Sequence, residues 1–599
     1  DWVRVTSDLQ FRRWWKDDGL IHPDISSLMI RQEARTALGF WDRVRVGADT
    51  EYHDRLRARF GADAVPPTAA GVPLGLGRLR PESLTGRAET SIQSHIYGDR
   101  RSYTRAAQRW HAQGGGQHLP AHPQIRPFAA PPSLSIGAPT TPCATALVAG
   151  PDRMLDAGLF DDLWYMTTYP DLRAQDVDGV RHYWHHGAGE GRDPSAVFST
   201  SGYARDHGIS LADVPRHALA AGVVQYLPDW AGNRVGQHPK QPHIIVFGHK
   251  AGAEIFGAER VLLQVLDRAH LAGVRVSVVL PHSLSDSYHT AVLARCDRLF
   301  IRPYGWHFDG VAPPVATVQR LAALIEQTGA DVVHQMTSVL SAPLCAAKAA
   351  GVPSVVHVHE LPQQDPRLCY DMGTTPDALR GHLLRWADTC VAVSPAVAQW
   401  LDAPGRTQNW HNAVDTDLAD LPTPAPHGRP LRVALIGSLT ARKGIADYRA
   451  LAQQSKRDGI DYVMIGPMTA DLEALPRWPA VLHHAGYADT PTTALAQADI
   501  VVNLSLFEES HGLTIHEALV AGRPVVVYDQ PALRNLIGDS GAGIIVPPRD
   551  ITALRRAILR LRDPASFAAA SQAARIRGAT LQARAQNQGD ALFRTPPRC

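Results

Sequence analysis

From residue 241 onward, short apolar runs rich in β-branched residues alternate with longer segments of helical character. Eleven such runs occur, from HIIVFGH at 243–249 to AGIIVP at 542–547. Continuous apolar strands separated by helices predict parallel sheets covered by helices on both faces. Eleven strands are too many for one ordinary doubly wound sheet. A stretch rich in Pro and Gly, residues 420–430, divides them into a set of five and a set of six.

The division predicts an α/β fold with two Rossmann-like domains, residues 241–420 and 421–599, that face a cleft. Ligands of such sheets bind at the carboxyl ends of the strands, so the loops after the strands are where chemistry is expected. A chain of 599 residues is too long for one core, so more than one domain is expected. Composition divides the residues before 241 into three segments. They are an Arg- and Trp-rich piece at 1–131, a Pro- and Ala-rich linker at 132–158, and a small aromatic and His-rich helical module at 159–240.

The composition is that of an ordinary globular protein, with 45% hydrophobic and 20% charged residues. A formal net charge of +2 gives no electrostatic reason to expect nucleic acid as a partner. The six cysteines have no CxxC pair, which favours buried free thiols in a reducing cytoplasm over disulfides. No apolar run approaches the ~20 residues of a membrane span. The chain opens with Asp rather than Met, so we interpret it as processed or as part of a longer protein.

Two glutamates, Glu509 and Glu517, stand eight positions apart in FEESHGLTIHEALVAGRP, directly after a predicted strand. Acidic residues near a helix start commonly offset its dipole or cap free amides, which would explain Glu509 better than Glu517. One carboxylate can also accept both hydroxyls of a vicinal diol. The pair therefore predicts a clamp on a nucleotide sugar, with the ribose at Glu517 and the second sugar at Glu509.

Groups suited to a diphosphate occur in two loops of the second domain. In GSLTARKGIADY, Arg442 and Lys443 stand where a strand gives way to a helix. A cation beside a helix amino end suits a diphosphate, although solvated surface cations are the alternative. The backbone amides of Gly512, Leu513 and Thr514 would open the helix that follows Glu509, and free amides of this kind bind phosphate.

Two residues of the first domain are further candidates for the site. Gly257, in KAGAEIFGAERVLLQVL, precedes a long amphipathic helix and would let the backbone approach a ligand, unless it only makes a tight turn. His359 ends the buried strand VVHVHEL, where a catalytic and a structural histidine are both plausible. The histidines of HYWHHG lack a matching acid, and GAGEGR lacks a preceding strand. Neither motif therefore predicts a metal or dinucleotide site.

Together these motifs resemble the retaining glycosyltransferases of family 4 (group 1), which have the GT-B fold. The resemblance covers about residues 241–580, and its most specific part is E-x7-E, from Glu509 to Glu517, with the sequel AGRPVVV. The segments FGAER, VAVSPAVAQWL, HNAVDTD and KG, and a strand ending in His, are also similar and occur in the family's order.

The resemblance implies that Glu517 binds the ribose, Glu509 contacts the donor sugar and Lys443 meets the diphosphate. Ser438 stands where the family often has Arg, so Arg442 is the expected substitute. Net retention at the anomeric carbon without a metal ion is also implied. The nucleotide-diphosphate sugar is then a co-substrate, and no cofactor is expected.

The implied reaction is hexosyl transfer from a nucleotide-diphosphate sugar to a glycan or lipid-linked acceptor in bacterial-type cell-surface polysaccharide synthesis. His359 would hydrogen-bond to the donor sugar. The expected location is the cytoplasm, with a peripheral contact at the inner face of the membrane and no nucleic-acid partner. A sugar-nucleotide epimerase on the same fold and a non-catalytic sugar-nucleotide-binding scaffold are the alternatives.

The amino-terminal piece resembles the carboxyl half of family-2 glycosyltransferases, which have the GT-A fold. The similar stretch is ALGFWDRVRVGADTEYHDRLRARFG, in which Ala48 replaces the first acid of the family's acidic pair and Asp49 takes the general-base position. The nucleotide-binding half with its DxD is missing from this sequence, so the resemblance implies an inactive piece. The module at 159–240 resembles short aromatic repeats found beside bacterial polysaccharide transferases.

Overall fold

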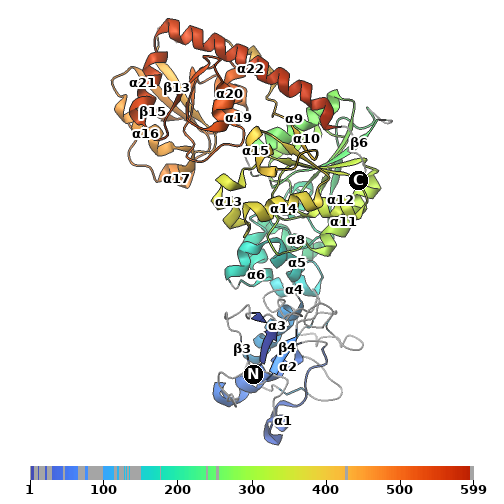
Figure 1. Ribbon diagram of the computed structural model, residues 1–599. Coiled ribbons are helices and arrows are strands. Elements are labelled where there is room, and N and C mark those ends of the chain that lie inside the picture. Colours follow the sequence, from blue (N-terminus) through green and yellow to red (C-terminus); the bar gives the residue numbers. More distant parts are fainter. Residues whose placement is uncertain are drawn as a thin grey trace. The chain divides into compact units, whose positions relative to one another are not determined.

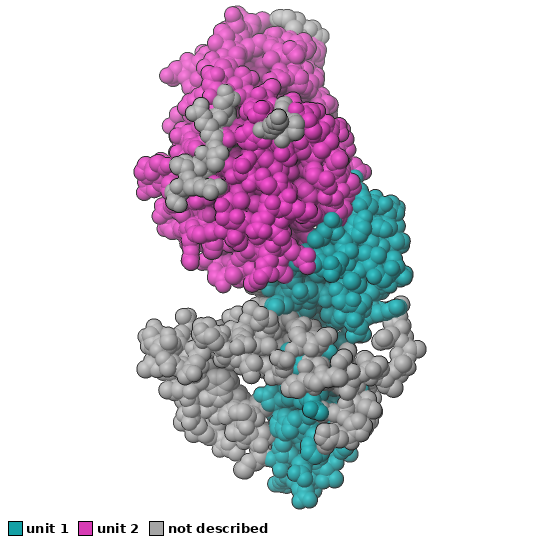
Figure 2. Space-filling view, turned by 90° about the vertical axis from the view of Figure 1, so that its right-hand side faces the viewer, with its two compact units in different colours: residues 1–227 teal, residues 228–599 magenta. Residues whose placement is uncertain are grey.

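The structure of the chain is a computed structural model. It describes residues 2–5, 11–12, 21–22, 30–44, 47–64, 75–78, 99–112, 118–119, 127–128, 130, 134, 150–175, 177–237, 241–250, 252, 255–424 and 429–593. The chain forms two compact units, residues 1–227 and 228–599 (Figure 2).

The larger unit contains two separate sheets (Figure 1). The first sheet has the strand order β12-β11-β10-β9-β6-β7-β8-β5, and all neighbours are parallel except β5, which is antiparallel to β8. Its strands are β5 (Asp229–Ala231), β6 (His243–Phe247), β7 (Arg275–Leu280), β8 (Arg298–Ile301), β9 (Val332–Gln335), β10 (Ser354–Val358), β11 (Thr389–Ala392) and β12 (Thr407–Asn409). The five runs predicted for this domain are the strands β6, β7, β9, β10 and β11.

The second sheet is parallel throughout, in the order β15-β14-β13-β16-β17-β18. Its strands are β13 (Leu431–Ile436), β14 (Ile460–Ile465), β15 (Leu482–His484), β16 (Ile500–Asn503), β17 (Val525–Tyr528) and β18 (Gly543–Val546). Numbered along the chain this is 3-2-1-4-5-6, the Rossmann order. The predicted fold class of two Rossmann-like α/β domains is therefore confirmed.

Helices connect the strands of both sheets, and apolar clusters lie on both faces of each sheet. The helices of the first half are α9 (Gly257–Leu271), α10 (Asp286–Leu293), α11 (Val315–Thr328), α12 (Ala342–Ala349), α13 (Pro366–Asp371), α14 (Pro376–Trp386) and α15 (Pro395–Leu401). Those of the second half are α16 (Ile445–Gln454), α17 (Ala470–Glu473), α18 (Pro491–Leu495), α19 (Leu513–Val520), α20 (Pro531–Ile537), α21 (Ile551–Leu561) and α22 (Pro564–Leu592).

The long helix α22 joins the second sheet to the first (Figure 1). It packs on α19, and its later part reaches the first domain, where the Trp410 indole donates to the Ala585 carbonyl at 3.2 Å. Phe593, just after the helix, is buried in the core of the first sheet. The last described part of the predicted domain 421–599 therefore packs on the first domain, because Phe593 completes the core of the first sheet.

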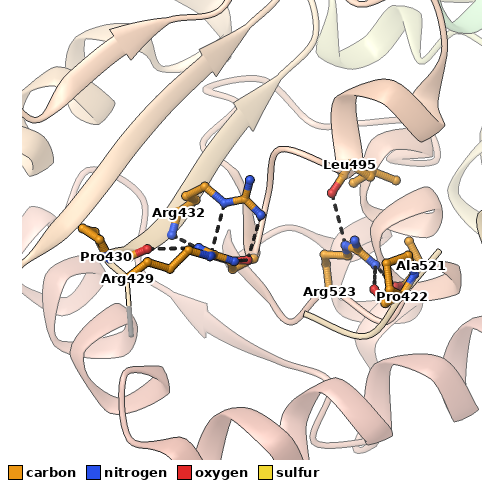
Figure 3. A network of polar contacts seen from close by, with 8 residues as sticks. Pro422, Arg429, Pro430, Arg432, Leu495, Ala521 and Arg523 are labelled. Carbon is orange, nitrogen blue, oxygen red and sulfur yellow. Dashed lines mark hydrogen bonds and ion pairs between the residues drawn. The ribbon is translucent and has the colours of Figure 1, made fainter. Parts of the chain in front are cut away.

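The connection between the two sheets is held by arginines (Figure 3). The buried Arg523, from the AGRP motif, donates to the carbonyls of Leu495 and Pro422. At the amino end of β16, the fully buried Asp499 accepts two hydrogen bonds of 2.7 Å from Arg429 and further ones from Arg432. Burial raises the pKa of Asp499, but these hydrogen bonds outweigh burial and leave that pKa below its usual value.

The smaller unit contains the aromatic module, built from α4 (Pro151–Asp156), α5 (Asp162–Thr168), α6 (Gly179–His182), α7 (Thr200–His207) and α8 (Val214–Ala221). Its end extends to residue 227 rather than 240, because β5 belongs to the larger unit. Its start also differs from the prediction, since α4 lies within the expected linker 132–158 and buries Met154 in the module core. In HYWHHG, Nδ1 of His182 forms a hydrogen bond of 3.0 Å with the Tyr165 hydroxyl.

The amino-terminal piece has a sheet in which β1 (Trp2–Val5) pairs with β2 (Phe11–Arg12), β3 (Ile21–His22) and β4 (Gly75–Arg78), and helices α1 (Gln32–Leu38), α2 (Ala48–Phe60) and α3 (Asp99–Ala112). Asp49 lies in the first turn of α2. The nearby Glu51 is buried against Arg55 and His111, each at 3.0 Å. Much of residues 1–131 lies outside the described residues, and the GT-A resemblance stays a prediction.

Candidate functional site

Two loops at the carboxyl edge of the second sheet lie against each other. After β13, a short 3₁₀ turn (Ala441–Lys443) ends at Gly444, which has φ +76°. A Cβ on Gly444 would lie 2.2 Å from the carbonyl oxygen of Leu504, in the loop after β16, so only glycine fits there. The Leu506 amide also donates to the Arg442 carbonyl at 2.8 Å. This close approach brings the KG turn beside the loop that carries Glu509.

Glu509 lies in a network of polar groups and does not cap a helix. Its Oε1 is 2.6 Å from Lys443 Nζ, and it also accepts from Ser505 Oγ at 2.5 Å and Asn503 Nδ2 at 3.4 Å. Its own amide donates to the Gln530 side chain at 3.0 Å. Burial raises the pKa of Glu509, but Lys443 and the hydrogen bonds outweigh burial and hold that pKa below its usual value. The carboxylate is therefore charged and lies beside a cation, a contact that was not predicted from the sequence.

The amino end of α19 is open for an anion. Gly512 is the residue before the helix, has φ +84° and supplies no side-chain cap. The first backbone amide with an acceptor in this turn is that of Ile515, which donates to Gly512. Among the described residues, the amides of Leu513 and Thr514 have no hydrogen-bond acceptor. Free amides at a helix start are the groups that bind phosphate.

Glu517 is buried one turn further along α19, with 5% of its surface exposed. Its Oε1 lies 3.5 Å from NH1 of Arg260, which comes from α9 in the first domain. Burial raises the pKa of Glu517 to about 7; Arg260 opposes this rise and Asp415 adds to it. A carboxylate with a single long contact keeps acceptor capacity for a diol.

Gly257 lies where the two domains approach each other. It is the first residue of α9, and a Cβ added to it would lie 3.8 Å from Leu513 Cδ2. The Tyr487 hydroxyl accepts from the Ile255 amide at 2.8 Å and donates to the Ile255 carbonyl at 3.0 Å. The glycine turn of the first domain is therefore fixed against the loop after β15 and the start of α19.

His359 directly follows β10 at the carboxyl edge of the first sheet. Its Nε2 is buried and has no hydrogen-bond partner among the described residues. Its amide donates to Glu360, whose carboxylate also accepts from Ser338 Oγ at 2.7 Å in the loop after β9. Burial lowers the pKa of His359 to about 4, and Glu360 opposes this change. The ring is neutral at neutral pH and has a free nitrogen for a hydroxyl.

Arg442 and Lys443 have different ion-pair partners. Nη2 of Arg442 lies 3.1 Å from Asp365, just before α13 in the first domain, and its guanidinium lies 4.4 Å from the centre of the Phe507 ring. Lys443 Nζ lies 4.7 Å from the centre of the same ring. Asp365, Phe507 and Arg260 were not predicted from the sequence. Arg260 lies in the FGAER motif, three residues after Gly257, so its helical spacing was a signal for it.

A cavity of about 680 Å³ lies away from these residues, beside the connection between the sheets. Arg429, Arg562 and Arg575 line it. Two of these three cations already have partners within the protein, since Arg429 donates to Asp499 and Arg575 donates to backbone carbonyls. Within the described part of the chain, no three His, Cys, Asp or Glu side chains are grouped to hold a metal ion. No described helix has the length and apolar character to cross a membrane.

Comparisons with known proteins agree with this geometry. The sequence is 25% identical over 261 residues to alpha-D-kanosaminyltransferase of Streptomyces kanamyceticus, covering 37% of this chain and 64% of that protein. It is 29% identical over 239 residues to GDP-mannose-dependent alpha-mannosyltransferase of Mycobacterium tuberculosis, covering 36% and 60%. Phosphatidyl-myo-inositol mannosyltransferase of Mycolicibacterium smegmatis is 26% identical over 319 residues, covering 51% and 81%. The chain thus spans less than two thirds of the first two of these relatives.

A solved Anabaena protein in complex with UDP-glucose aligns with 58% of this chain and 99% of its own length, at 17% identity and a TM-score of 0.48. Two family models match the larger unit. Residues 255–418 match the model for Glycosyltransferase Family 4, and residues 430–563 match the model for Glycosyl transferases group 1. These two ranges, one in each Rossmann-like domain, identify the larger unit, residues 228–599, as a glycosyltransferase of family 4, group 1 with the GT-B fold.

Proposed function

We propose that the larger unit is a retaining glycosyltransferase that moves a hexosyl group from a nucleotide-diphosphate sugar to an acceptor. The observation that carries the proposal is the line of complementary groups at the carboxyl edge of the second sheet. Glu517 offers a buried acceptor for a ribose diol, and Lys443 beside Glu509 offers a cation and an acid. The amides of Leu513 and Thr514, which have no acceptor among the described residues, are available for phosphate.

In this proposal the chemistry depends on the leaving diphosphate. Lys443 and the helix amides would stabilise its charge, an electrostatic effect commonly worth several kcal/mol. Arg442 would add a second cation once it leaves Asp365. Glu509 would hold hydroxyls of the transferred sugar, and the free Nε2 of His359 would bond to the same sugar near the reacting carbon. Gly257 would allow the first domain to approach the diphosphate.

The relatives support sugar transfer but leave the substrates open. One is named for kanosamine, one for GDP-mannose and one for phosphatidyl-myo-inositol, so the sugar and the acceptor differ among them. For this chain we propose a glycan or lipid-linked acceptor in cell-surface polysaccharide synthesis, reached from the cytoplasm at the inner face of the membrane. The sugar nucleotide is the co-substrate, and we propose that no metal ion takes part.

The test is release of nucleoside diphosphate from UDP- and GDP-sugars by the full chain, with and without glycan and lipid-linked acceptors. Release stimulated by an acceptor, with an α-linked product from an α-linked donor, is the expected result. Isomerised donor would instead indicate an epimerase, and donor binding without turnover would indicate a scaffold. An inverted anomeric configuration in the product would contradict the retaining mechanism alone.

A further inference from the structure

The first residues of two helices, one from each Rossmann-like domain, lie side by side next to the proposed donor site. Gly257, at the start of α9, faces Leu513, at the start of α19. One turn further along both helices, NH1 of Arg260 lies 3.5 Å from Oε1 of Glu517. The two contacts follow each other at helical spacing. Arg260 is therefore directed to Glu517 by the packing of the two helices.

The pair is formed by a buried acid and a cation that reaches it from the other domain. The Glu517 side chain is 6% exposed and that of Arg260 is 22% exposed. An ionised carboxylate in such a place is costly without an opposite charge nearby. At 3.5 Å the contact is a long hydrogen bond to Oε1, so it sets a positive charge beside the carboxylate, while Oε2 has no partner among the described residues.

The other charged and titratable groups around Glu517 do not replace Arg260. Asp415, in the loop after β12, acts on Glu517 directly. Asp267 on α9, Arg295 after α10 and Asp417 act on Asp415. His411 acts on His511 and His516 at the start of α19, Arg577 on α22 acts on His516, and Arg584 on α22 acts on His411. Burial raises the pKa of Glu517 most, Asp415 raises it further, and Arg260 is the cation that lowers it.

We propose that Arg260 is a positioning residue for the donor, which keeps the Glu517 carboxylate charged and directed at the ribose hydroxyls. This inference rests on the proposed function. A protonated Glu517 would offer one donor and fewer acceptor positions to the diol, so the nucleotide would lose its charge-assisted hydrogen bonds. Removing Arg260 should therefore weaken nucleotide binding most at the pH values where Glu517 becomes neutral.

The experiment is calorimetric titration of the full chain with UDP and with GDP between pH 5.5 and 9. For the nucleotide that binds, Arg260→Gln is expected to weaken binding roughly tenfold at pH 7. Its affinity should recover toward that of the unsubstituted chain at pH 9. Arg260→Lys, which keeps the charge, should follow the profile of the unsubstituted chain. The terminal phosphate of the ligand titrates equally in every series, so differences between variants report on the protein.

Two controls separate this role from a structural one. In a Glu517→Gln background, Arg260→Gln should change the affinity less than about twofold, because no titrating carboxylate is left to support. Arg268→Gln removes a cation from the same helix that bonds to the Gln586 carbonyl at 2.8 Å, and should leave the pH profile unchanged.

The inference is overturned if Arg260→Gln weakens binding equally at all pH values, or keeps its effect in the Glu517→Gln background. It is also overturned if Arg268→Gln shifts the profile in the same way. In each of these cases nucleotide binding by the unsubstituted chain would still support the proposed function. Failure of the folded, unsubstituted chain to bind either nucleotide would reject the proposed function and this inference together.

Discussion

Lys443 Nζ lies 2.6 Å from Glu509 Oε1, although the family resemblance assigns these residues to different halves of the donor. Lys443 is expected at the diphosphate and Glu509 at the transferred sugar. Because of this contact, Glu509 orients Lys443. The diphosphate and the sugar of the donor would therefore bind to two residues that form one ion pair. Ser505 and Asn503 bond to the same carboxylate oxygen and fix the pair in place.

The first prediction concerns Glu509→Gln. Because this change frees Lys443 and removes a contact to the sugar only, affinity for the nucleoside diphosphate should stay within about threefold or increase, while kcat falls at least tenfold. Calorimetry and steady-state kinetics measure the two effects. Glu508→Gln removes a charge one residue away and is the matched control. A large loss of nucleotide affinity in Glu509→Gln would show that this acid binds the nucleotide itself.

The second prediction concerns Glu517→Gln. Loss of a charged hydrogen-bond acceptor for the ribose should weaken nucleoside diphosphate binding by about 1.5–3 kcal/mol. Stability should not fall at pH 8. The reason is that a carboxyl group with a raised folded pKa favours the folded state below the unfolded value near 4.5, and that advantage is lost as the pH rises through about 7. The neutral amide avoids this loss.

The melting temperature and the dissociation constant, measured on the same Glu517→Gln sample, distinguish a role in ribose binding from a role in helix capping. A role in capping would give the opposite pattern, with normal binding and about 0.5–2 kcal/mol less stability. The structure already argues against that role, since Gly512 precedes the helix and Glu517 lies inside it.

The third prediction is that transfer needs no divalent metal. Lys443, the helix amides and Arg442 supply the positive charge that a metal would otherwise bring to the diphosphate. Activity of the full chain should therefore be unchanged in excess EDTA. Complete loss of activity, restored by manganese, would contradict this and would turn attention to the amino-terminal piece.

The fourth prediction is a steep loss of stability in acid. Burial lowers the pKa of five histidines to about 3 or 4: His282, His334, His359, His382 and His516. Between pH 6.5 and about 4 the unfolded chain binds more protons at these sites, so the free energy of unfolding should fall as the pH falls. Each histidine adds a slope of about 1.4 kcal/mol per pH unit.

Denaturant midpoints at pH 5, 6 and 7 test this expectation. His282→Asn should reduce the slope, because it removes one of the five sites, whereas His185→Asn on an exposed helix position should not. Equal midpoints at pH 5 and pH 7 would show that these rings gain protons without unfolding.

The parts of the fold that could be predicted are those that depend on local sequence patterns. All eleven predicted runs are strands, because a strand buried on both faces is a continuous apolar run. The strands β5, β8 and β12 were missed. β5 (DWA) and β12 (TQN) are the two edge strands and have polar, partly exposed residues, and β8 (RLFI) has an apolar run of only three residues. For residues 132–158 the composition predicted a linker, but Pro151–Asp156 form the helix α4, which buries Met154 in the core of the module.

In the candidate site, too, local sequence patterns were informative, whereas contacts between distant segments were not predictable. Lys443, Glu509 and Glu517 follow strand ends and helix starts, so a pattern of strand, loop and helix was enough to select them as candidates; their roles stay predictions. Partners from distant segments were not predictable, as with Arg260, which reaches Glu517 from the first domain. The pairing of Arg442 with Asp365 joins residues of different domains, and only the packed structure sets that distance.

The burial of Phe593 in the core of the first sheet has a consequence for synthesis on the ribosome. The strands of that sheet are made before the second domain, but the side chain that completes their core is made after it. A nascent chain therefore carries an incomplete first domain, with apolar surface uncovered, while the second domain is being synthesised. Such intermediates are prone to aggregation, so this fold should depend on chaperones during synthesis more than a chain whose domains close in the order in which they are made.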